Sequence, residues 1–257
     1  MLFAVSTLGY PGRPIDQVGA LLRRHGVEAV QLRCASDEPV HVGIDTAARR
    51  DIRRRLGDEG LALIGLATYV NLAGGATDFA AHLDLAHDLG APALRLMPGG
   101  GDHPSTHLQR AAETLSRIAA RTNGSGVRLL VETHDAFLRG DDLRRLLEMA
   151  QAGPAVGAIW DALHPWRAGE APAVTAAALS PWLAEVQIKD VAAPTRLHPL
   201  VPGSGAVPLP EVLTRAREAG FDGPVVLEHE ARWYPDAAPI DETIEGAQRV
   251  LAAAWPQ

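Results

Sequence analysis

Four residues suited to binding a cation close or follow short apolar runs in the second half of the chain: Glu132, Asp161, Gln187 and Glu228. If those runs are neighbouring parallel strands, their carboxyl ends meet at one edge, and three carboxylates and an amide converge there. Because crowded carboxylates repel one another, a divalent cation among them is the simplest way to balance their charge. The alternative is that each acid only caps the following helix, which is common at a single position but improbable at four adjacent strands.

The elements that must position these residues alternate regularly. Apolar runs that predict strands lie at 2–6, 28–32, 61–67, 93–97, 127–131, 156–160, 183–188 and 224–227. Segments of helical period lie between them, at 15–24, 45–56, 78–89, 106–121, 142–150, 171–179, 209–219 and 241–254. Eight strand and helix units in 257 residues predict an α/β fold, a single (β/α)8 TIM barrel spanning residues 1–257.

Further patterns favour the barrel over an open sheet. Several of the runs are apolar on both faces, as parallel strands covered by helices require. A doubly wound sheet is the alternative, but no glycine-rich dinucleotide fingerprint follows the first run.

Composition narrows the classes of partner and compartment. Lys and Arg number 24 against 31 Asp and Glu, and the basic residues form no long stripe, which argues against nucleic acid. Cys34 is the single cysteine, and the N-terminus lacks a basic region and a cleavage site, so we expect a cytoplasmic location. The longest uncharged stretch, 60–77, contains several glycines and an asparagine, so we expect no membrane segment.

The sequence segments around the four polar residues resemble those of a known family. They are Val131-Glu132-Thr133-His134, Trp160-Asp161-Ala162-Leu163-His164-Pro165, Val186-Gln187-Ile188-Lys189-Asp190 and Leu227-Glu228. In this order the chain resembles the xylose isomerase-like TIM-barrel superfamily of sugar isomerases and epimerases. The resemblance covers nearly the whole chain. It includes Pro202-Gly203-Ser204-Gly205 before the seventh helix and Gly220-Phe221-Asp222-Gly223-Pro224 before the last strand.

The resemblance implies one divalent metal ion held by Glu132, Asp161, Gln187 and Glu228. The family more often has histidine at the position of Gln187, although glutamine occurs in its hydroxypyruvate isomerase-like branch. With glutamine there, all the ligands are oxygen atoms, which favours Mn²⁺ or Mg²⁺ over softer metals. We therefore expect Mn²⁺ or Mg²⁺ with open positions for substrate.

The resemblance also implies a reaction. A metal with open positions can bind the adjacent oxygens of a ketose, an inosose or a similar polyhydroxy ketone and stabilise the enediolate formed on proton removal. In the similar epimerases the two metal-bound glutamates lie on opposite faces of the reacting carbon. Glu132 and Glu228 are thus expected to serve as general base and general acid.

Five residues are candidates for substrate binding: His164, His134, Lys189, Arg196 and Trp166. His164 matches the histidine of a family Asp-x-x-His motif that contacts substrate oxygens. His134 and Lys189 each lie two residues after a predicted ligand and point to the same end of the barrel. Arg196 lies in the long loop after the seventh strand, and Trp166 offers an aromatic wall for a sugar face.

Two other arginines, Arg33 and Arg95, lie near the ends of the second and fourth strands. Either can meet an anionic substrate at the mouth or form an ion pair with the acids, and the sequence does not decide between these roles.

Other functions are compatible with the same barrel. A dehydratase or other lyase would use the same metal and enolate but expel a hydroxyl group. An endonuclease IV-like DNA repair enzyme needs further histidine ligands, and acidic net charge disfavours it. A non-catalytic sugar-binding barrel would not need three clustered acids.

We expect a small carbohydrate or polyol as substrate and no nucleic acid or membrane partner. A homo-oligomer would agree with related barrels, although the sequence has no feature that shows it.

Overall fold

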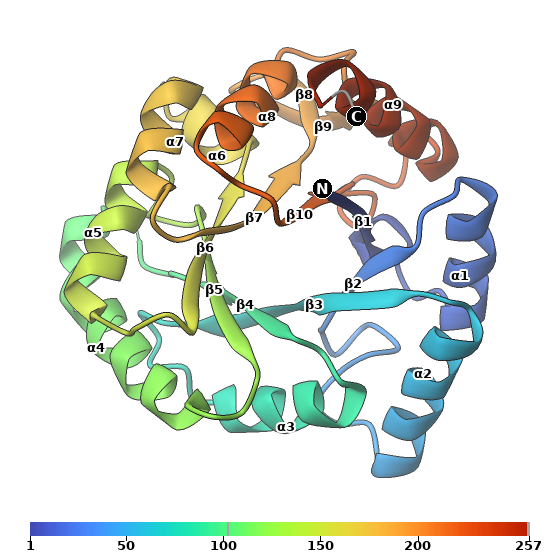
Figure 1. Cartoon of the computed structure of the whole chain (residues 1–257), viewed down its shortest axis with the longest axis horizontal. Helices are drawn as coiled ribbons and strands as arrows, with labels where there is room; N and C mark the ends of the chain where they lie inside the picture. The colour runs from blue at the N-terminus through green and yellow to red at the C-terminus, as the bar shows by residue number, and fades with distance from the viewer. Residues whose placement is uncertain (102, 256–257) are drawn as a thin grey trace.

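The computed structural model describes residues 1–101 and 103–255, and it is a closed barrel of eight parallel strands (Figure 1). The barrel strands are β1 (Leu2–Ser6), β2 (Ala29–Arg33), β3 (Ala62–Asn71), β4 (Ala93–Met97), β5 (Arg128–Glu132), β6 (Val156–Asp161), β7 (Leu183–Ile188) and β10 (Pro224–Leu227). Neighbouring strands follow chain order, and β1 pairs with β10 to close the barrel. The predicted single TIM barrel is confirmed.

Eight helices alternate with these strands and surround the barrel (Figure 1): α1 (Ile15–Arg24), α2 (Thr46–Asp58), α3 (Phe79–Leu89), α4 (Pro104–Thr122), α5 (Gly140–Ala150), α7 (Pro172–Leu179), α8 (Leu209–Glu218) and α9 (Ile240–Ala254). Their apolar faces pack on the outer face of the strands in one large core. Among the residues described, no helix combines the length and the hydropathy that crossing a membrane would need.

The predicted elements are found with bounds shifted by a few residues. The third strand is longer than the predicted run 61–67 and carries Tyr69 near its end. The helix predicted at 106–121 begins at Pro104, because proline is favoured in a first helical turn. Additional short elements lie in the loops: η1 (Thr7–Gly9), α6 (Leu163–Arg167), and a hairpin of β8 (Asp190–Ala193) and β9 (Arg196–Leu200).

The interior of the barrel changes character along the strands. Small or aliphatic residues fill the lower interior in two clusters: Ala93, Leu130, Ile159 and Ala184 in one, and Ala4, Ala29 and Val226 in the other. Because side chains two residues apart point to the same face of a strand, the next inward residue lies one step closer to the mouth. On six strands that next residue is polar: Ser6, Gln31, Arg95, Glu132, Asp161 and Glu228. A single step of two residues therefore separates the apolar core from the candidate site.

Candidate active site and metal centre

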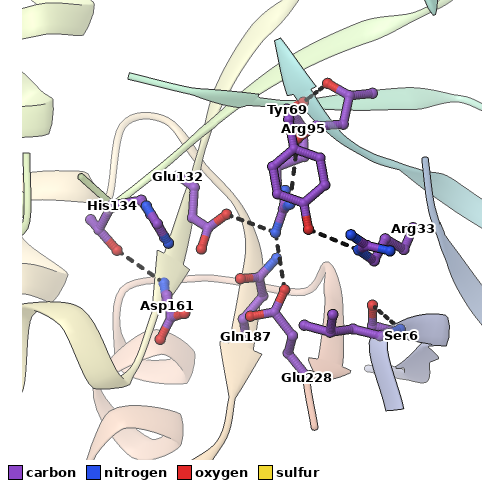
Figure 2. Close-up of polar contacts among 12 residues, drawn as sticks. Ser6, Arg33, Tyr69, Arg95, Glu132, His134, Asp161, Gln187 and Glu228 are labelled. Carbon is purple, nitrogen blue, oxygen red and sulfur yellow. Dashed lines mark hydrogen bonds and ion pairs between the residues drawn. The ribbon is translucent and has the colours of Figure 1, made fainter. Parts of the chain in front are cut away.

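The predicted acids meet at the carboxyl ends of β5, β6 and β10. Glu132 and Asp161 are fully buried, and Glu228 is 3% exposed. Each offers a carboxylate oxygen, and the three oxygens lie within 4.8 Å of one another. Gln187 on β7 is also fully buried, and Figure 2 shows its side chain beside Glu228 and facing the same cluster. The structure thus brings together the four residues expected to be metal ligands.

Two buried cations balance these acids. The Nη1 atom of Arg95, from β4, lies 3.1 Å from Glu132 Oε2 and 3.0 Å from Glu228 Oε1 (Figure 2). The Nζ atom of Lys189 lies 2.8 Å from Asp161 Oδ2 and also contacts Glu228 Oε2. A third contact, of 2.9 Å, joins Lys189 Nζ to Glu230 Oε1 at the rim. Of the two roles open to Arg95 from the sequence, the structure shows the ion pair with the acids.

The two glutamates differ in protonation. Burial raises the pKa of Glu132 to about 7, and the nearby Arg95 only partly opposes this. Burial acts on Glu228 in the same direction, but Lys189 and Arg95 outweigh it and bring the pKa of Glu228 to about 2. At neutral pH Glu228 is therefore ionised, whereas Glu132 is shared between its protonated and ionised forms. Pairs of carboxyl groups with separated pKa values are typical of acid and base roles.

A layer of amides and one carboxylate lies beneath the cluster. Glu185, two residues before Gln187 on the same face of β7, accepts hydrogen bonds from Gln187 Nε2 at 2.9 Å and from Gln31 Nε2 at 2.8 Å. Because Glu185 engages the amide nitrogen of Gln187, the Oε1 atom of Gln187 is left buried and accepts no hydrogen bond from any described residue. Only this oxygen can bind a cation, so Glu185 selects the orientation that a metal site requires.

The donor set fits a divalent cation. Both carboxylate oxygens of Glu132 and the Oδ2 atom of Asp161 are buried and, like Gln187 Oε1, accept no hydrogen bond from the described part of the chain. Arg95 and Lys189 are at ion-pair distance from these carboxylates but do not have hydrogen-bond geometry to these oxygens. Buried acceptors without donors are costly, and a hard cation would satisfy several at once.

Two histidines flank the cluster on the side of β5 and β6. The rings of His134 and His164 meet edge to face, with centroids 4.5 Å apart. Burial lowers the pKa of His164 well below its usual value, so its imidazole is neutral. Together with Glu132, the histidines form a second group whose donor atoms lie within 4.8 Å of one another.

The family assignment follows from the sequence comparison. The sequence model of the xylose isomerase-like TIM barrel family matches residues 20–253. The chain belongs to this family. No curated protein matches its sequence.

Several solved structures share the fold of this xylose isomerase-like barrel. One is the IolI protein with a bound zinc atom, at 13% identity with all of both chains covered and a TM-score of 0.83. Another is the D-psicose 3-epimerase of Clostridium cellulolyticum H10 with D-tagatose, at 12% identity, 99% of each chain and a TM-score of 0.79. A third is the probable 3-DHS dehydratase AsbF of Bacillus anthracis, at 16% identity, with 96% of this chain and 99% of that chain covered, and a TM-score of 0.78.

Two of the predicted substrate-binding residues lie apart from the acid cluster of this xylose isomerase-like barrel. Arg196 is exposed at the start of β9 and makes none of the cluster's ion pairs or hydrogen bonds within the described ranges. Trp166 is half-buried on α6 and packs against the main hydrophobic core. Tyr69 and Trp233 are the aromatic side chains beside Arg33, whose guanidinium carbon lies 5.3 and 5.4 Å from their ring centroids.

Some residues of the site were missed from the sequence. Glu185 and Gln31 lie inside predicted strands, and Trp233 lies in the loop after β10. A signal for Glu185 existed, because residues 185, 187 and 189 are all polar and share one face of a strand. No comparable pattern marks Trp233, whose position depends on how its loop folds over the mouth.

Proposed function

We propose that this protein is a divalent-metal-dependent isomerase or epimerase of ketoses, inososes or similar polyhydroxy ketones. The observation that carries the proposal is the buried pair Glu132 and Glu228, whose carboxylates contact the same nitrogen of Arg95 and whose pKa values are driven apart. The fold shared with a D-psicose 3-epimerase supports the choice of a sugar substrate.

Four residues would hold the metal: Glu132, Asp161, Gln187 and Glu228. When bound, Mn²⁺ or Mg²⁺ would supply charge stabilisation for a substrate whose adjacent oxygens become negative during proton removal. The all-oxygen donor set is the reason for preferring these two ions. On the same argument, Gln187→His would shift the preference towards Zn²⁺ or Co²⁺.

The protein groups would move the proton. Glu228 would remove a proton from one face of the carbon next to the carbonyl, and Glu132 would return a proton to the other face. The reverse reaction exchanges their roles. Arg95, held between both carboxylates, fixes the separation of the two groups and keeps the charge balanced as the proton moves.

Lys189 would donate a hydrogen bond to a substrate oxygen. The residue is 4% exposed, and its ammonium group bridges Asp161 and Glu228, two of the residues that would hold the metal. His134 and His164 follow β5 and β6, and their nitrogens can bind substrate hydroxyl groups or a metal ion. Arg196 and Trp166 would contact substrate only through a movement of their elements.

A dehydratase that uses the same residues is the second candidate. The shared fold of AsbF supports it, and Lys189 could protonate a departing hydroxyl group. An epimerase product has the same composition as its substrate, whereas a dehydratase product is an unsaturated carbonyl compound with a new ultraviolet band.

The decisive experiment combines metal analysis with isotope exchange. Protein purified without added metal is analysed for bound ions beside the double variant Glu132→Gln, Glu228→Gln. About one Mn²⁺ or Mg²⁺ per chain in the wild type, lost in the double variant, supports the site. A screen of ketoses and inososes in D₂O then tests for exchange of one carbon-bound proton. No metal after titration with Mn²⁺ would contradict the proposal and favour a sugar-binding barrel.

A further inference from the structure

We propose a second metal-binding position, formed by Glu132, His134 and His164 beside the all-oxygen site. One donor atom from each residue lies within 4.8 Å of the other two. Glu132 belongs to both positions, and its two carboxylate oxygens accept no hydrogen bond from residues 1–101 or 103–255. A carboxylate can bridge two ions with one oxygen each. This inference depends on the proposed function in one respect, that both use Glu132.

His164 is the first sign that a ligand belongs here. The residue is 6% exposed, and neither Nδ1 nor Nε2 forms a hydrogen bond with any described part of the chain. One nitrogen of a neutral imidazole carries a lone pair, and burying it without a partner costs free energy. The Nε2 atom of His164 lies 3.5 Å from Asp161 Oδ2, which is longer than an ordinary hydrogen bond. A metal ion would use the unpaired nitrogen.

His134 is oriented as metal-binding histidines usually are. Its Nδ1 atom lies 2.8 Å from Asp135 Oδ1. The Asp135 N–H lies at the same distance from Nδ1, but an ionised carboxylate favours the tautomer that carries its proton on Nδ1. The lone pair is then on Nε2. A carboxylate that fixes the far nitrogen of a histidine is a frequent companion of metal ligation.

The backbone around Asp135 supports this orientation. Asp135 has a φ of +51°, a left-handed conformation that is uncommon for residues other than glycine. In this conformation its Oδ2 atom accepts a hydrogen bond of 2.9 Å from the Gly99 N–H, while its Oδ1 atom faces His134. Gly99 has a φ of +72°, which other residues rarely adopt, and a Cβ atom there would collide with the Asn71 side chain, so glycine is favoured at the donor position. The backbone of Gly99, in the loop after β4, thus fixes the Asp135 carboxylate, and this carboxylate fixes the orientation of the His134 ring.

The position is reachable from outside. A cavity of about 370 Å³ is lined by His134, Asp135, His164, Arg167, Glu230 and Trp233, among others. Two imidazoles and one carboxylate suit Zn²⁺, Fe²⁺ or Co²⁺, in contrast with the all-oxygen site. The second ion would contact substrate oxygens in place of the histidines themselves.

Cobalt provides the test, because Co²⁺ binds both oxygen and imidazole ligands and absorbs visible light according to its ligands. Metal-free wild type is titrated with CoCl₂ and analysed for metal and absorption. The same is done for His134→Ala, His164→Ala, Asp161→Asn and the control His87→Ala, which removes an exposed histidine on α3. Circular dichroism and thermal melting show whether each variant is folded.

We expect two Co²⁺ per chain in the wild type and in His87→Ala, and one in each of the other variants. The ions that remain differ: His134→Ala and His164→Ala lose the imidazole-dependent absorption, whereas Asp161→Asn keeps it. Asp135→Ala leaves both histidines in place and should weaken the second ion's binding roughly 10- to 100-fold.

The outcomes separate this inference from the proposed function. A single Co²⁺ that Asp161→Asn loses and the histidine variants retain overturns the second position and leaves the proposed function standing. A single Co²⁺ with the opposite pattern supports the second position and contradicts the all-oxygen site. Two Co²⁺ in the histidine variants also overturn the inference.

Discussion

The two halves of the barrel mouth differ in charge. Strands β5, β6, β7 and β10 contribute the acids and Gln187, whereas β2, β3 and β4 contribute Arg33, Tyr69 and Arg95. Arg95 reaches from its own half to both glutamates of the other, but Arg33 pairs with Asp37 and Glu38 in the loop that follows its own strand. Both arginines lie at the mouth, but only Arg95 belongs to the acid cluster, because only Arg95 contacts acids on the other side of the barrel.

Removing a single carboxylate from the acidic half of the mouth should have the largest effect. Glu132→Gln and Glu228→Gln should each lower turnover by roughly 10²- to 10⁴-fold, because each removes one proton-transfer group. Near-normal melting temperatures would show that the fold is retained. Glu148→Gln, an exposed acid on α5, is the control and should leave turnover unchanged. Full activity in either site variant would contradict the two-glutamate mechanism.

The link between the halves can be removed with Arg95→Met. This leaves Glu132 and Glu228 buried without their shared cation and should lower the free energy of unfolding of the metal-free protein by about 3–5 kcal/mol. Arg54→Met is the matched control, because Arg54 also pairs with two acids, Asp51 and Asp58, but is exposed. Its loss should be under about 1 kcal/mol. Equal losses in chemical denaturation would mean that Arg95 does not organise the acids.

The layer below the acids predicts how stability depends on pH. Burial raises the pKa of Glu185 to about 7, although hydrogen bonds from Gln187 and Gln31 oppose it. Between about pH 4.5 and 7 the folded protein keeps this proton while the unfolded chain releases it, so rising pH favours unfolding. The metal-free protein should lose on the order of 3 kcal/mol through this group. Glu132, whose pKa is also raised, adds a loss of the same sign.

Glu185→Gln separates the two contributions, because the variant has no proton to release there. Its unfolding free energy, measured by urea denaturation at several pH values, should fall less steeply from pH 4.5 to 7 than that of the wild type. Parallel curves for the two proteins would show that Glu185 is ionised throughout.

The sequence predicts the backbone fold more completely than it predicts the contacts of the side chains in the candidate site. The barrel followed from eight apolar runs and the helical segments between them, because hydrophobic period reports secondary structure directly. The strand-end rule led to Glu132, Asp161, Gln187 and Glu228, which the structure brings together. Arg95 stayed undecided because its partners are 37 and 133 residues away along the chain, and only strand order around the closed barrel determines such contacts. Trp166 and Arg196 lie on short loop elements whose presence the strand and helix pattern did not indicate.

The hydrogen bond from Gln187 to Glu185 can be tested through metal affinity. Glu185→Gln should weaken Mn²⁺ binding roughly 10-fold or more, because the amide of Gln187 is then free to turn its nitrogen to the acids. Calorimetric titrations of Glu185→Gln, Gln187→Ala and the double variant form a thermodynamic cycle. If Glu185 acts through Gln187, the double variant binds Mn²⁺ no more weakly than Gln187→Ala alone. Additive losses would mean that Glu185 acts only through its charge.

The smallest effect is expected on the basic half of the mouth. Tyr69 accepts a hydrogen bond of 2.8 Å from Arg33 Nε, and Tyr69→Phe removes this bond while keeping the ring beside Arg95. The unfolding free energy should fall by about 1 kcal/mol, and Mn²⁺ affinity should not change, because no acid of the cluster loses a partner. Tyr10→Phe is the matched control. The Tyr10 hydroxyl is buried and has no hydrogen-bond partner among the described residues, so its removal should cost nothing. A change in Mn²⁺ affinity in Tyr69→Phe would show that the two halves are coupled through Arg33 as well as Arg95.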